Sequence, residues 1–323
     1  MELVLNNYGI KLSISNNVFI VTNEEGKHRI PIRDVDTIIV CKNASLTSNA
    51  ILLAIDNNIQ ILFYDYEGIP KGRIWSNQYG SISTIRKGQL TFCQSKQSVD
   101  WIKGMLVRKI RNQLVYIDYL SRKFKKQIDN DTLRSMNKCI SKISDLHCDN
   151  IRQIAAFLRG NEGYASKKYF MILNEFIPEN LRFSNRTQHP ARDPVNAFLN
   201  YGYGILYHEV ENNLIKTGLD PYIGVFHRDE YNRPSLVYDF IEPYRIWIDH
   251  IVYSLAISGL ITEECCDFQE TGCILDAPGR QILLKETNEY LSSCSRQSER
   301  GNSRRFEMFL EIQQFAQNMK KQI

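Results

Sequence analysis

The sequence lacks the glycine-rich and nucleophile motifs of several large enzyme classes. It contains no Gly-x-Gly-x-x-Gly motif, no phosphate-binding P-loop and no Gly-x-Ser-x-Gly elbow, and no cysteine lies in a recognisable nucleophile context. Dinucleotide-dependent redox chemistry, P-loop nucleotide hydrolysis and serine-elbow hydrolysis are therefore disfavoured.

Features of secreted and membrane proteins are also missing. The N-terminus has no basic segment followed by an apolar run, and the apolar run 251–261 falls short of the ~20 residues that span a bilayer. The eight cysteines form no CxxC pair. A zinc site from Cys265, Cys266, Cys273 and a distant histidine is disfavoured, because adjacent cysteines suit tetrahedral coordination poorly. We expect free thiols in a soluble, cytoplasmic protein with no membrane partner.

Length and composition predict a globular chain. The 323 residues are 43% hydrophobic and 24% charged, which excludes a disordered or fibrous protein. The net charge of +4 is too small to identify a partner, so only local clusters of charge could indicate nucleic acid.

The first part of the chain has the pattern of short strands. Residues 11–15 alternate polar and apolar side chains, Asn16 and Asn17 suit a tight hairpin turn, and residues 18–21 continue as a second strand. Residues 49–56 follow as one helix. This region is therefore predicted to be β-rich.

The pattern becomes helical after about residue 90. The sequence predicts an α+β chain with a small N-terminal β-rich domain at 1–85, a linker at 86–98 and a larger all-α domain at 99–323. Residues 101–126 carry eight basic residues against one acidic residue, Asp118. This segment is either a solvated helix face or a surface for the DNA backbone.

Capping residues divide the helical part. A helix is predicted to begin at Asn150 and to end at Gly160, and Asn161 is predicted to begin another. Asp193 before a proline is a clear helix start. Pro243 interrupts a later helix.

Three acidic residues lie in largely apolar helical contexts. Glu162 is predicted in a first helical turn, and Asp239 and Glu242 are spaced to share one helix face. Burying carboxylates is costly unless a cation or partner offsets the charge. Arg245, three residues after Glu242, could supply an ion pair. Alternatively, carboxylates and an imidazole could hold Mg²⁺ or Mn²⁺.

His227 lies in the loop that enters the helix of Asp239 and Glu242. Loop histidines are usually surface residues, and His189, His208 and His250 are no stronger as ligands. The sequence alone does not show whether the fold joins such separate segments.

Four segments complete the pattern, in a fixed order: 160–170 (GNEGYASKKYF), 192–203 (RDPVNAFLNYGY), 218–227 (GLDPYIGVFH) and 233–245 (RPSLVYDFIEPYR). Together they resemble the CRISPR spacer-acquisition integrases, the first of the CRISPR-associated protein families. The resemblance implies an N-terminal β domain that forms homodimers, and a larger helical catalytic domain.

The resemblance also implies an activity and a site. The family consists of divalent-metal-dependent DNA endonucleases and integrases. It implies Glu162, His227 and Glu242 as ligands of Mg²⁺ or Mn²⁺, with Asp239 as a further catalytic acid. Six residues beside these positions are expected to bind DNA: Lys167, Lys168, Arg228, Ser235, Tyr238 and Arg245.

The expected function is the insertion of new spacers into a CRISPR array. A 3′-hydroxyl of the protospacer duplex would attack a phosphodiester of the CRISPR repeat, and the missing P-loop agrees with a reaction that needs no ATP. A small ferredoxin-like CRISPR-associated protein is the expected partner. The alternatives are a branched-DNA nuclease in repair and a catalytically inactive DNA-binding scaffold.

Overall fold

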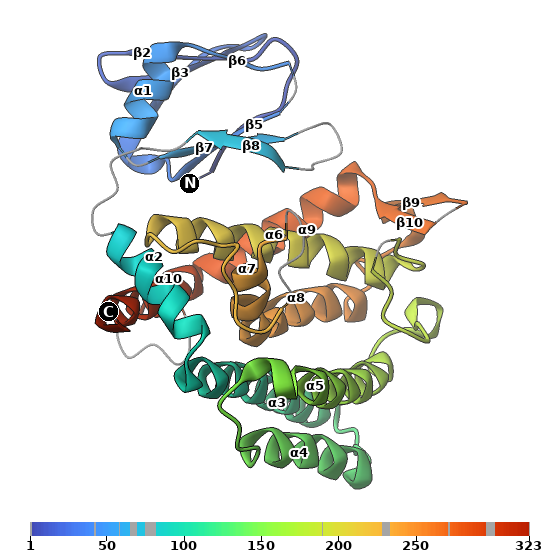
Figure 1. Ribbon diagram of the computed structural model, residues 1–323. Coiled ribbons are helices and arrows are strands. Elements are labelled where there is room, and N and C mark those ends of the chain that lie inside the picture. Colours follow the sequence, from blue (N-terminus) through green and yellow to red (C-terminus); the bar gives the residue numbers. More distant parts are fainter. Residues whose placement is uncertain are drawn as a thin grey trace. The chain divides into compact units, whose positions relative to one another are not determined.

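The chain divides into two compact units in the computed structural model, Met1–Gly80 and Ser81–Ile323 (Figure 1). The first unit is β-rich and the second is mostly helical, which confirms the predicted fold class. The structure describes residues 2–41, 43–57, 59–64, 70–74, 82–188, 190–227, 233–270, 272–294 and 301–322.

The N-terminal unit contains two four-stranded sheets. The first has the order β1-β5-β7-β8, in which β1, β5 and β7 are parallel and β8 is antiparallel to β7. The second has the order β4-β3-β2-β6. The strands are β1 (Glu2–Leu5), β2 (Lys11–Ser15), β3 (Val18–Asn23), β4 (Gly26–Pro31), β5 (Thr37–Val40), β6 (Ser45–Leu46), β7 (Gln60–Tyr64) and β8 (Pro70–Ile74).

Local sequence signals in this unit are confirmed. Asn16 and Asn17 have φ angles of 50° and 56° and form the turn between β2 and β3. Helix α1 (Ser48–Asp56) begins where the Thr47 side chain accepts a hydrogen bond from the Ala50 amide. These elements depend on neighbouring residues, so the sequence predicts them well.

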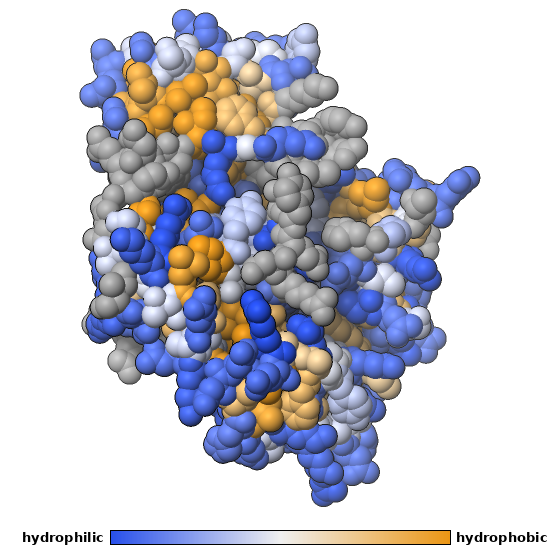
Figure 2. All heavy atoms as spheres, in the orientation of Figure 1, coloured by the Kyte–Doolittle hydropathy of each residue, from blue (hydrophilic) through white to orange (hydrophobic). Residues whose placement is uncertain are grey.

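Apolar side chains of the N-terminal unit form a core and also a surface. Leu5, Phe19 and Ile38 are fully buried between the elements. Figure 2 shows further hydrophobic side chains gathered on one face of this unit. Exposed large hydrophobic side chains in this unit include Tyr8 and Leu52. An apolar patch that is contiguous on the surface is typical of an interaction site, whereas single exposed apolar side chains are common.

The second unit is built from helices and one short hairpin. Its helices are α2 (Ile82–Cys93), α3 (Lys96–Phe124), α4 (Asn130–Ser144), α5 (Ile151–Asn174), α6 (Pro194–Lys216), α7 (Ser235–Ile241), α8 (Arg245–Ile257), α9 (Ala277–Ser292) and α10 (Arg304–Met319). The antiparallel hairpin pairs β9 (Cys266–Gln269) with β10 (Gly272–Leu275).

The predicted linker at 86–98 is helical in the structure. It lies in α2 and the first turn of α3. This polar segment is an amphipathic helix: Ile85 and Phe92 are buried, and the Gln89 amide donates to the carbonyls of Asp220 and Ile223 at 2.8 Å. The mixed polar and apolar composition of this segment therefore reflects an amphipathic helix and not a linker.

Helix α5 also differs from the prediction, because it continues through Gly160 as a single helix. The Asn150 cap is confirmed, since its side chain accepts from the Arg152 amide at 3.0 Å. Leu158 and Ala165 are fully buried on either side of the glycine, and this packing outweighs the ~1 kcal/mol cost of a helical glycine. Glu162 consequently lies in the middle of a helix, not in its first turn.

Helix starts marked by proline are confirmed. The Asp193 carboxylate accepts from the Asn196 amide at 2.8 Å and begins α6. Pro243 interrupts the next helical segment, which leaves a 3-10 turn, η3 (Glu242–Tyr244), between α7 and α8. Glu242 therefore lies at the junction of α7 and η3.

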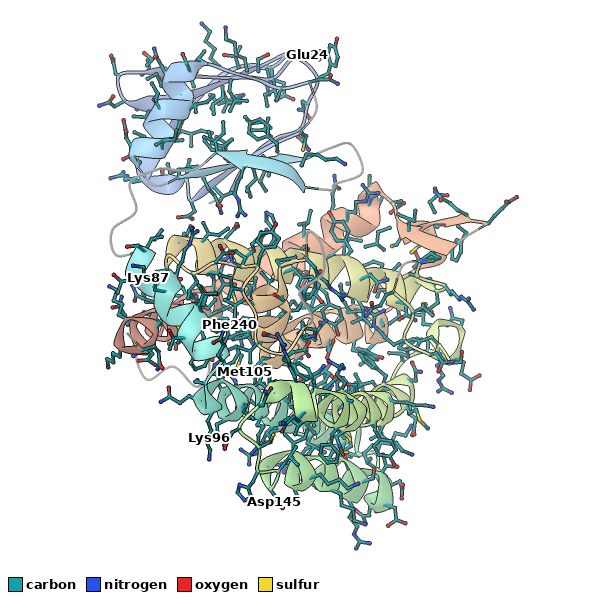
Figure 3. The ribbon with its side chains drawn as sticks, viewed as in Figure 1. Glu24, Lys87, Lys96, Met105, Asp145 and Phe240 are labelled. Carbon is teal, nitrogen blue, oxygen red and sulfur yellow. The ribbon has the colours of Figure 1, made fainter. Side chains whose placement is uncertain are left out.

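Aromatic rings hold α7 inside the helical unit. Phe240 lies 5.1 Å from the Trp101 ring of α3 and 5.0 Å from the Phe315 ring of α10, measured between ring centroids. Figure 3 shows Phe240 and Met105 between the helices, whereas Lys87 and Asp145 lie on the outside. Burial of one such apolar side chain contributes about 1.5–3 kcal/mol, so α7 and the turn after it are firmly placed.

Two further expectations concern thiols and membranes. The eight cysteines are free. Burial raises the pKa of the Cys266 and Cys273 thiols, which makes them poor nucleophiles and poor metal ligands. Within the ranges given above, no helix has the length and apolar character that a membrane span requires.

Candidate metal and phosphodiester site

Two of the predicted ligands converge on one buried cation. Glu162 of α5 and Glu242 of η3 both accept hydrogen bonds from the ammonium of Lys109, which lies on α3. Ser166, one turn after Glu162, donates to the same Glu162 oxygen, Oε1, at 2.8 Å. Glu162 and Glu242 lie 53 and 133 positions after Lys109 in the sequence, and the fold joins all three in one cluster.

Neighbouring residues of α3 fix this arrangement. The Asn112 side chain donates to the Pro243 carbonyl at 2.8 Å, and Gln113 donates to Ser166 at 3.5 Å. Helix α3 therefore contacts the backbone beside Glu242 and the hydroxyl beside Glu162. This scaffold sets the separation of the two carboxylates.

The charge of Glu242 depends on its neighbours. Burial alone would raise the pKa of this carboxyl, but the positive charges of Arg245 and Lys109 outweigh burial and lower the pKa to about 2. His227 lowers it further, which places the imidazole within electrostatic range of Glu242. Glu242 is therefore ionised at neutral pH although its side chain is buried.

Arg245 forms the ion pair expected from its spacing. Its Nε donates to Glu242 Oε1 at 3.1 Å, and its guanidinium also donates to the Tyr207 hydroxyl at 2.6 Å. The guanidinium carbon lies 4.8 Å from the centre of the Tyr203 ring. Arg245 and Lys109 thus use different oxygens of Glu242, so the ion pair leaves one oxygen for a second cation.

Asp239 organises the loop that carries His227. Its side chain is fully buried and accepts from the amides of Val225, Phe226 and His227 at 2.6, 3.1 and 3.0 Å. It also contacts His227 Nδ1 at 2.7 Å. Since a carboxylate only accepts, Nδ1 carries the proton, and Nε2 of the neutral ring keeps its lone pair.

The two acids that the sequence placed on one helix face have different partners in the structure. Asp239 lies in α7, while Glu242 begins η3, and only Glu242 contacts Lys109. Asp239 holds the backbone and ring of His227 in place, so its role is to orient a candidate ligand.

The residues expected to bind DNA have different surroundings. Lys167 is exposed, and the Lys168 ammonium lies 5.7 Å from the Tyr164 ring centre. Tyr238 is partly buried, 5.7 Å from the His227 ring. Arg228 lies outside the described residues.

Two of these residues are unsuited to direct DNA contact, which corrects the expectation. Ser235 is fully buried, and its hydroxyl donates to the Tyr222 carbonyl at 2.7 Å. Gly224 packs so closely on Ser235 that a Cβ would lie 2.7 Å from its side chain. Arg245 is used inside the protein by Glu242 and Tyr207.

The chemistry of the candidate ligands suits a hard divalent cation. Two carboxylates that meet at one positive charge, with an imidazole nearby, match the preference of Mg²⁺ and Mn²⁺ for oxygen and imidazole ligands. As the side chains stand in the described residues, no three His, Cys, Asp or Glu groups are clustered closely enough to hold a metal. The Lys109 ammonium is placed between Glu162 and Glu242.

Lys109 is the residue that sequence reasoning missed. It was counted only within the basic segment 101–126. A signal was nonetheless present: Lys109 lies three residues after Leu106 and four before Gln113, and all three are buried. A lysine within the buried stripe of a helix indicates an internal acid or acceptor that binds its ammonium.

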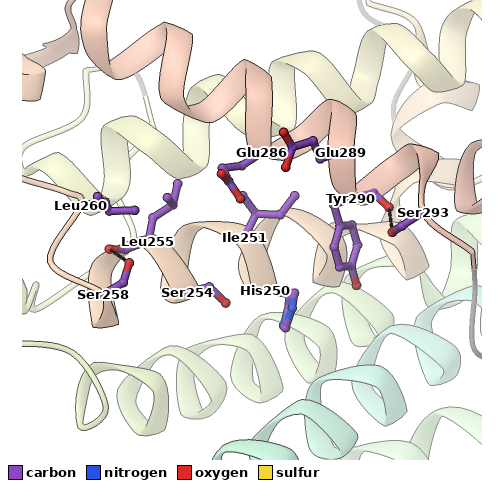
Figure 4. A pocket seen from close by; sticks show the side chains of 10 residues that line it. All are labelled: His250, Ile251, Ser254, Leu255, Ser258, Leu260, Glu286, Glu289, Tyr290 and Ser293. Atoms are coloured by element: carbon purple, nitrogen blue, oxygen red, sulfur yellow. Dashed lines mark hydrogen bonds between the residues drawn. The ribbon is translucent and has the colours of Figure 1, made fainter.

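A pocket elsewhere in the helical unit is separate from this site. Its volume is about 470 Å³, and it lies between α8 and α9 (Figure 4). His250, Ser254, Glu286 and Tyr290 are among its lining residues, whereas the candidate ligands do not line it. The carboxylate cluster was therefore identified from its chemistry and not from a cavity.

Comparison with known proteins adds an independent result. The family model described as CRISPR associated protein Cas1 matches residues 3–289. The chain is 31% identical to "CRISPR-associated endonuclease Cas1 1" of Archaeoglobus fulgidus, over 91% of this chain and 89% of that protein. It is 29% identical to "CRISPR-associated protein Cas1 3" of Methanobrevibacter ruminantium, over 88% of this chain and 86% of that protein.

Solved structures show the same fold. A Cas1 protein from Thermotoga maritima superposes with a TM-score of 0.78 and 22% identity, covering 98% of this chain and 96% of that one. A casposase bound to integration product superposes with a TM-score of 0.82 and 22% identity, covering 100% and 91%. Both β-rich and helical units are included in these matches. With the family model spanning most of its length, the chain belongs to the CRISPR-associated protein Cas1 family.

Proposed function

We propose that this protein is a divalent-metal-dependent DNA endonuclease and integrase that inserts new spacers into a CRISPR array. A 3′-hydroxyl of a protospacer duplex attacks a phosphodiester of the CRISPR repeat, and a repeat 3′-hydroxyl leaves. One phosphodiester bond forms and one breaks, so the reaction needs no ATP.

The observation that carries the proposal is the convergence of Glu162 and Glu242 on one positive charge, with His227 oriented beside them by Asp239. Glu162, Glu242 and His227 Nε2 are the groups that would hold Mg²⁺ or Mn²⁺. A bound divalent cation would stabilise charge on the reacting phosphate and orient an oxygen nucleophile.

The protein's own residues supply the framework for this chemistry. Asp239 fixes the tautomer of His227 and the path of its loop, so that the imidazole is placed before DNA arrives. Arg245 keeps Glu242 ionised and restrains one of its oxygens. The Lys167 side chain is exposed on the same helix, five residues after Glu162, and would neutralise DNA phosphate.

Named relatives support the reaction class. The Archaeoglobus relative is called an endonuclease, and a structural neighbour is a casposase bound to integration product. Another neighbour is called a Cas6-RT-Cas1–Cas2 complex. We infer DNA and a small ferredoxin-like CRISPR-associated protein as partners. The exposed Tyr8 and Leu52 support a homodimer through the β-rich unit.

A strand-transfer assay tests the proposal. The full-length protein and a short duplex with free 3′-hydroxyl ends are incubated with a supercoiled plasmid that carries repeats, with Mn²⁺ present. EDTA and the Glu162→Gln variant serve as negative controls, and the small partner protein is added in parallel. We expect covalent joining that is lost in both controls.

Other outcomes assign other functions. Cleavage of branched DNA without joining would indicate a branched-DNA nuclease in repair. DNA binding that is unchanged by EDTA, without any turnover, would indicate an inactive scaffold. Full joining by Glu162→Gln would remove Glu162 from the site.

A further inference from the structure

The Lys109 ammonium stands where the two candidate metal-ligating carboxylates meet. It donates to Glu162 Oε1 and to Glu242 Oε2, and its side chain is only 10% exposed. Arg245 holds the other oxygen of Glu242. Lys109 is therefore a counter-cation inside the cluster and not part of a solvated helix face.

Electrostatics explains why this position needs a cation at all times. Two carboxylates that share a site repel each other, and a buried carboxylate without a partner is strongly unfavourable. Among the described residues, the Arg245 guanidinium pairs with Glu242 and not with Glu162. Lys109 is the group that neutralises both carboxylates together.

We propose that Lys109 is a built-in counter-cation that competes with the divalent cation for Glu162 and Glu242, and that its ammonium moves away when the divalent cation binds. The inference rests on the metal site proposed above. A small dication requires direct contact with carboxylate oxygens, which the ammonium already occupies. The four-carbon stem of lysine allows the ammonium to move without a shift of α3.

Direct measurement of Mn²⁺ binding tests the competition without relying on catalysis. The full-length protein is titrated with Mn²⁺, and free Mn²⁺ is followed by its electron paramagnetic resonance signal. Lys109→Met removes the charge and keeps the length of the side chain. Lys103→Met is the matched control, because Lys103 is a second buried lysine of α3 whose ammonium binds the Leu146 carbonyl at 2.6 Å.

We expect Lys109→Met to bind Mn²⁺ about tenfold more tightly than the wild type, or better, because no competing ion pair has to be broken. Lys103→Met should bind like the wild type. Equal or weaker binding by Lys109→Met would overturn the proposal. Glu242→Gln tests the site itself: if it binds Mn²⁺ like the wild type, the proposed metal site is wrong, whatever Lys109 does.

A second measurement on the wild type applies even if Lys109→Met fails to fold. The Lys109 side-chain signal is followed by nuclear magnetic resonance in protein with ¹³C-labelled lysine, during titration with diamagnetic Mg²⁺. Lys109→Arg, which keeps the charge, identifies the signal by its loss. We expect the signal to shift as Mg²⁺ saturates the site. An unchanged signal at saturation would show that the ammonium stays in place.

Discussion

Asp239 offers the sharpest test of how the fold prepares this site. Asp239→Asn keeps the size of the side chain but replaces one acceptor oxygen with an NH₂ donor. Oδ2 serves the amides of Val225 and Phe226, and Oδ1 serves the amide and ring of His227. If the new NH₂ replaces Oδ2, the buried amides of Val225 and Phe226 lose their acceptor. If it replaces Oδ1, the His227 amide loses its acceptor, and the ring can accept from the NH₂ only by moving its proton to Nε2.

The structure sets the size of the effect. A buried donor left without an acceptor costs about 1–3 kcal/mol, so the loss for one or two donors is about 1–6 kcal/mol. We expect the free energy of unfolding of the helical unit to fall by about 3 kcal/mol. For a unit of this size, that corresponds to a decrease in Tm of about 6–12 °C.

Urea unfolding followed by far-UV circular dichroism measures this change. Asp145→Asn is the control, since Asp145 is an exposed residue at the end of α4 and should change stability by less than about 0.5 kcal/mol. At a temperature where Asp239→Asn remains folded, strand transfer should fall by about 10–100-fold, because His227 is no longer held. A loss of stability below about 1 kcal/mol would refute the reasoning.

Further predictions concern a buried acid and two helical glycines. Burial raises the pKa of Asp249 to about 6, against hydrogen bonds from Tyr203 and Tyr169 that lower it. The unfolded chain therefore releases this proton first as pH rises above 3.8, and stability falls up to about pH 6. Asp249→Asn should gain stability relative to the wild type across that interval, whereas a constant difference in urea midpoints would contradict it. Gly88→Ala should lower the free energy of unfolding by about 1–3 kcal/mol, because its Cβ would clash with the Met319 backbone oxygen. Gly104 is exposed with open space around it, so Gly104→Ala should raise the free energy of unfolding by about 0.5–1 kcal/mol. Equal melting temperatures of the two variants would exclude the clash.

Elements fixed by adjacent residues could be predicted from the sequence. The Asn16 and Asn17 turn, the Asp193 cap and the break at Pro243 each depend on the conformational preference of one or two residues. Gly160 was misread because a glycine only weakens a helix, and the packing of Leu158 and Ala165 comes from distant segments. Local preference is overruled where tertiary packing is strong.

The candidate site could be predicted only in part, because some of its residues meet only through tertiary packing. Motif order pointed to Glu162, His227 and Glu242, but the motifs begin at residue 160 and do not include Lys109 on α3. The different partners of Asp239 and Glu242 were also hidden, because helical spacing does not show which distant residue each acid meets. Charge partners distant in sequence are recognised only once the helices are packed.

The charge balance of the cluster links its two proposed states to DNA binding. Glu162 and Glu242 face Lys109 and Arg245, so two negative charges meet two positive charges and the cluster has little attraction for a phosphodiester. If a divalent cation takes the place of the ammonium, the charge at that point rises by one, and the displaced ammonium remains nearby on its flexible stem. Positive charge in a partly buried site attracts phosphate more strongly than the same charge in water. The exchange of cations, and not the carboxylates alone, therefore makes the site attractive to a phosphodiester. Until the exchange occurs, Lys109 keeps the net charge of the cluster near zero.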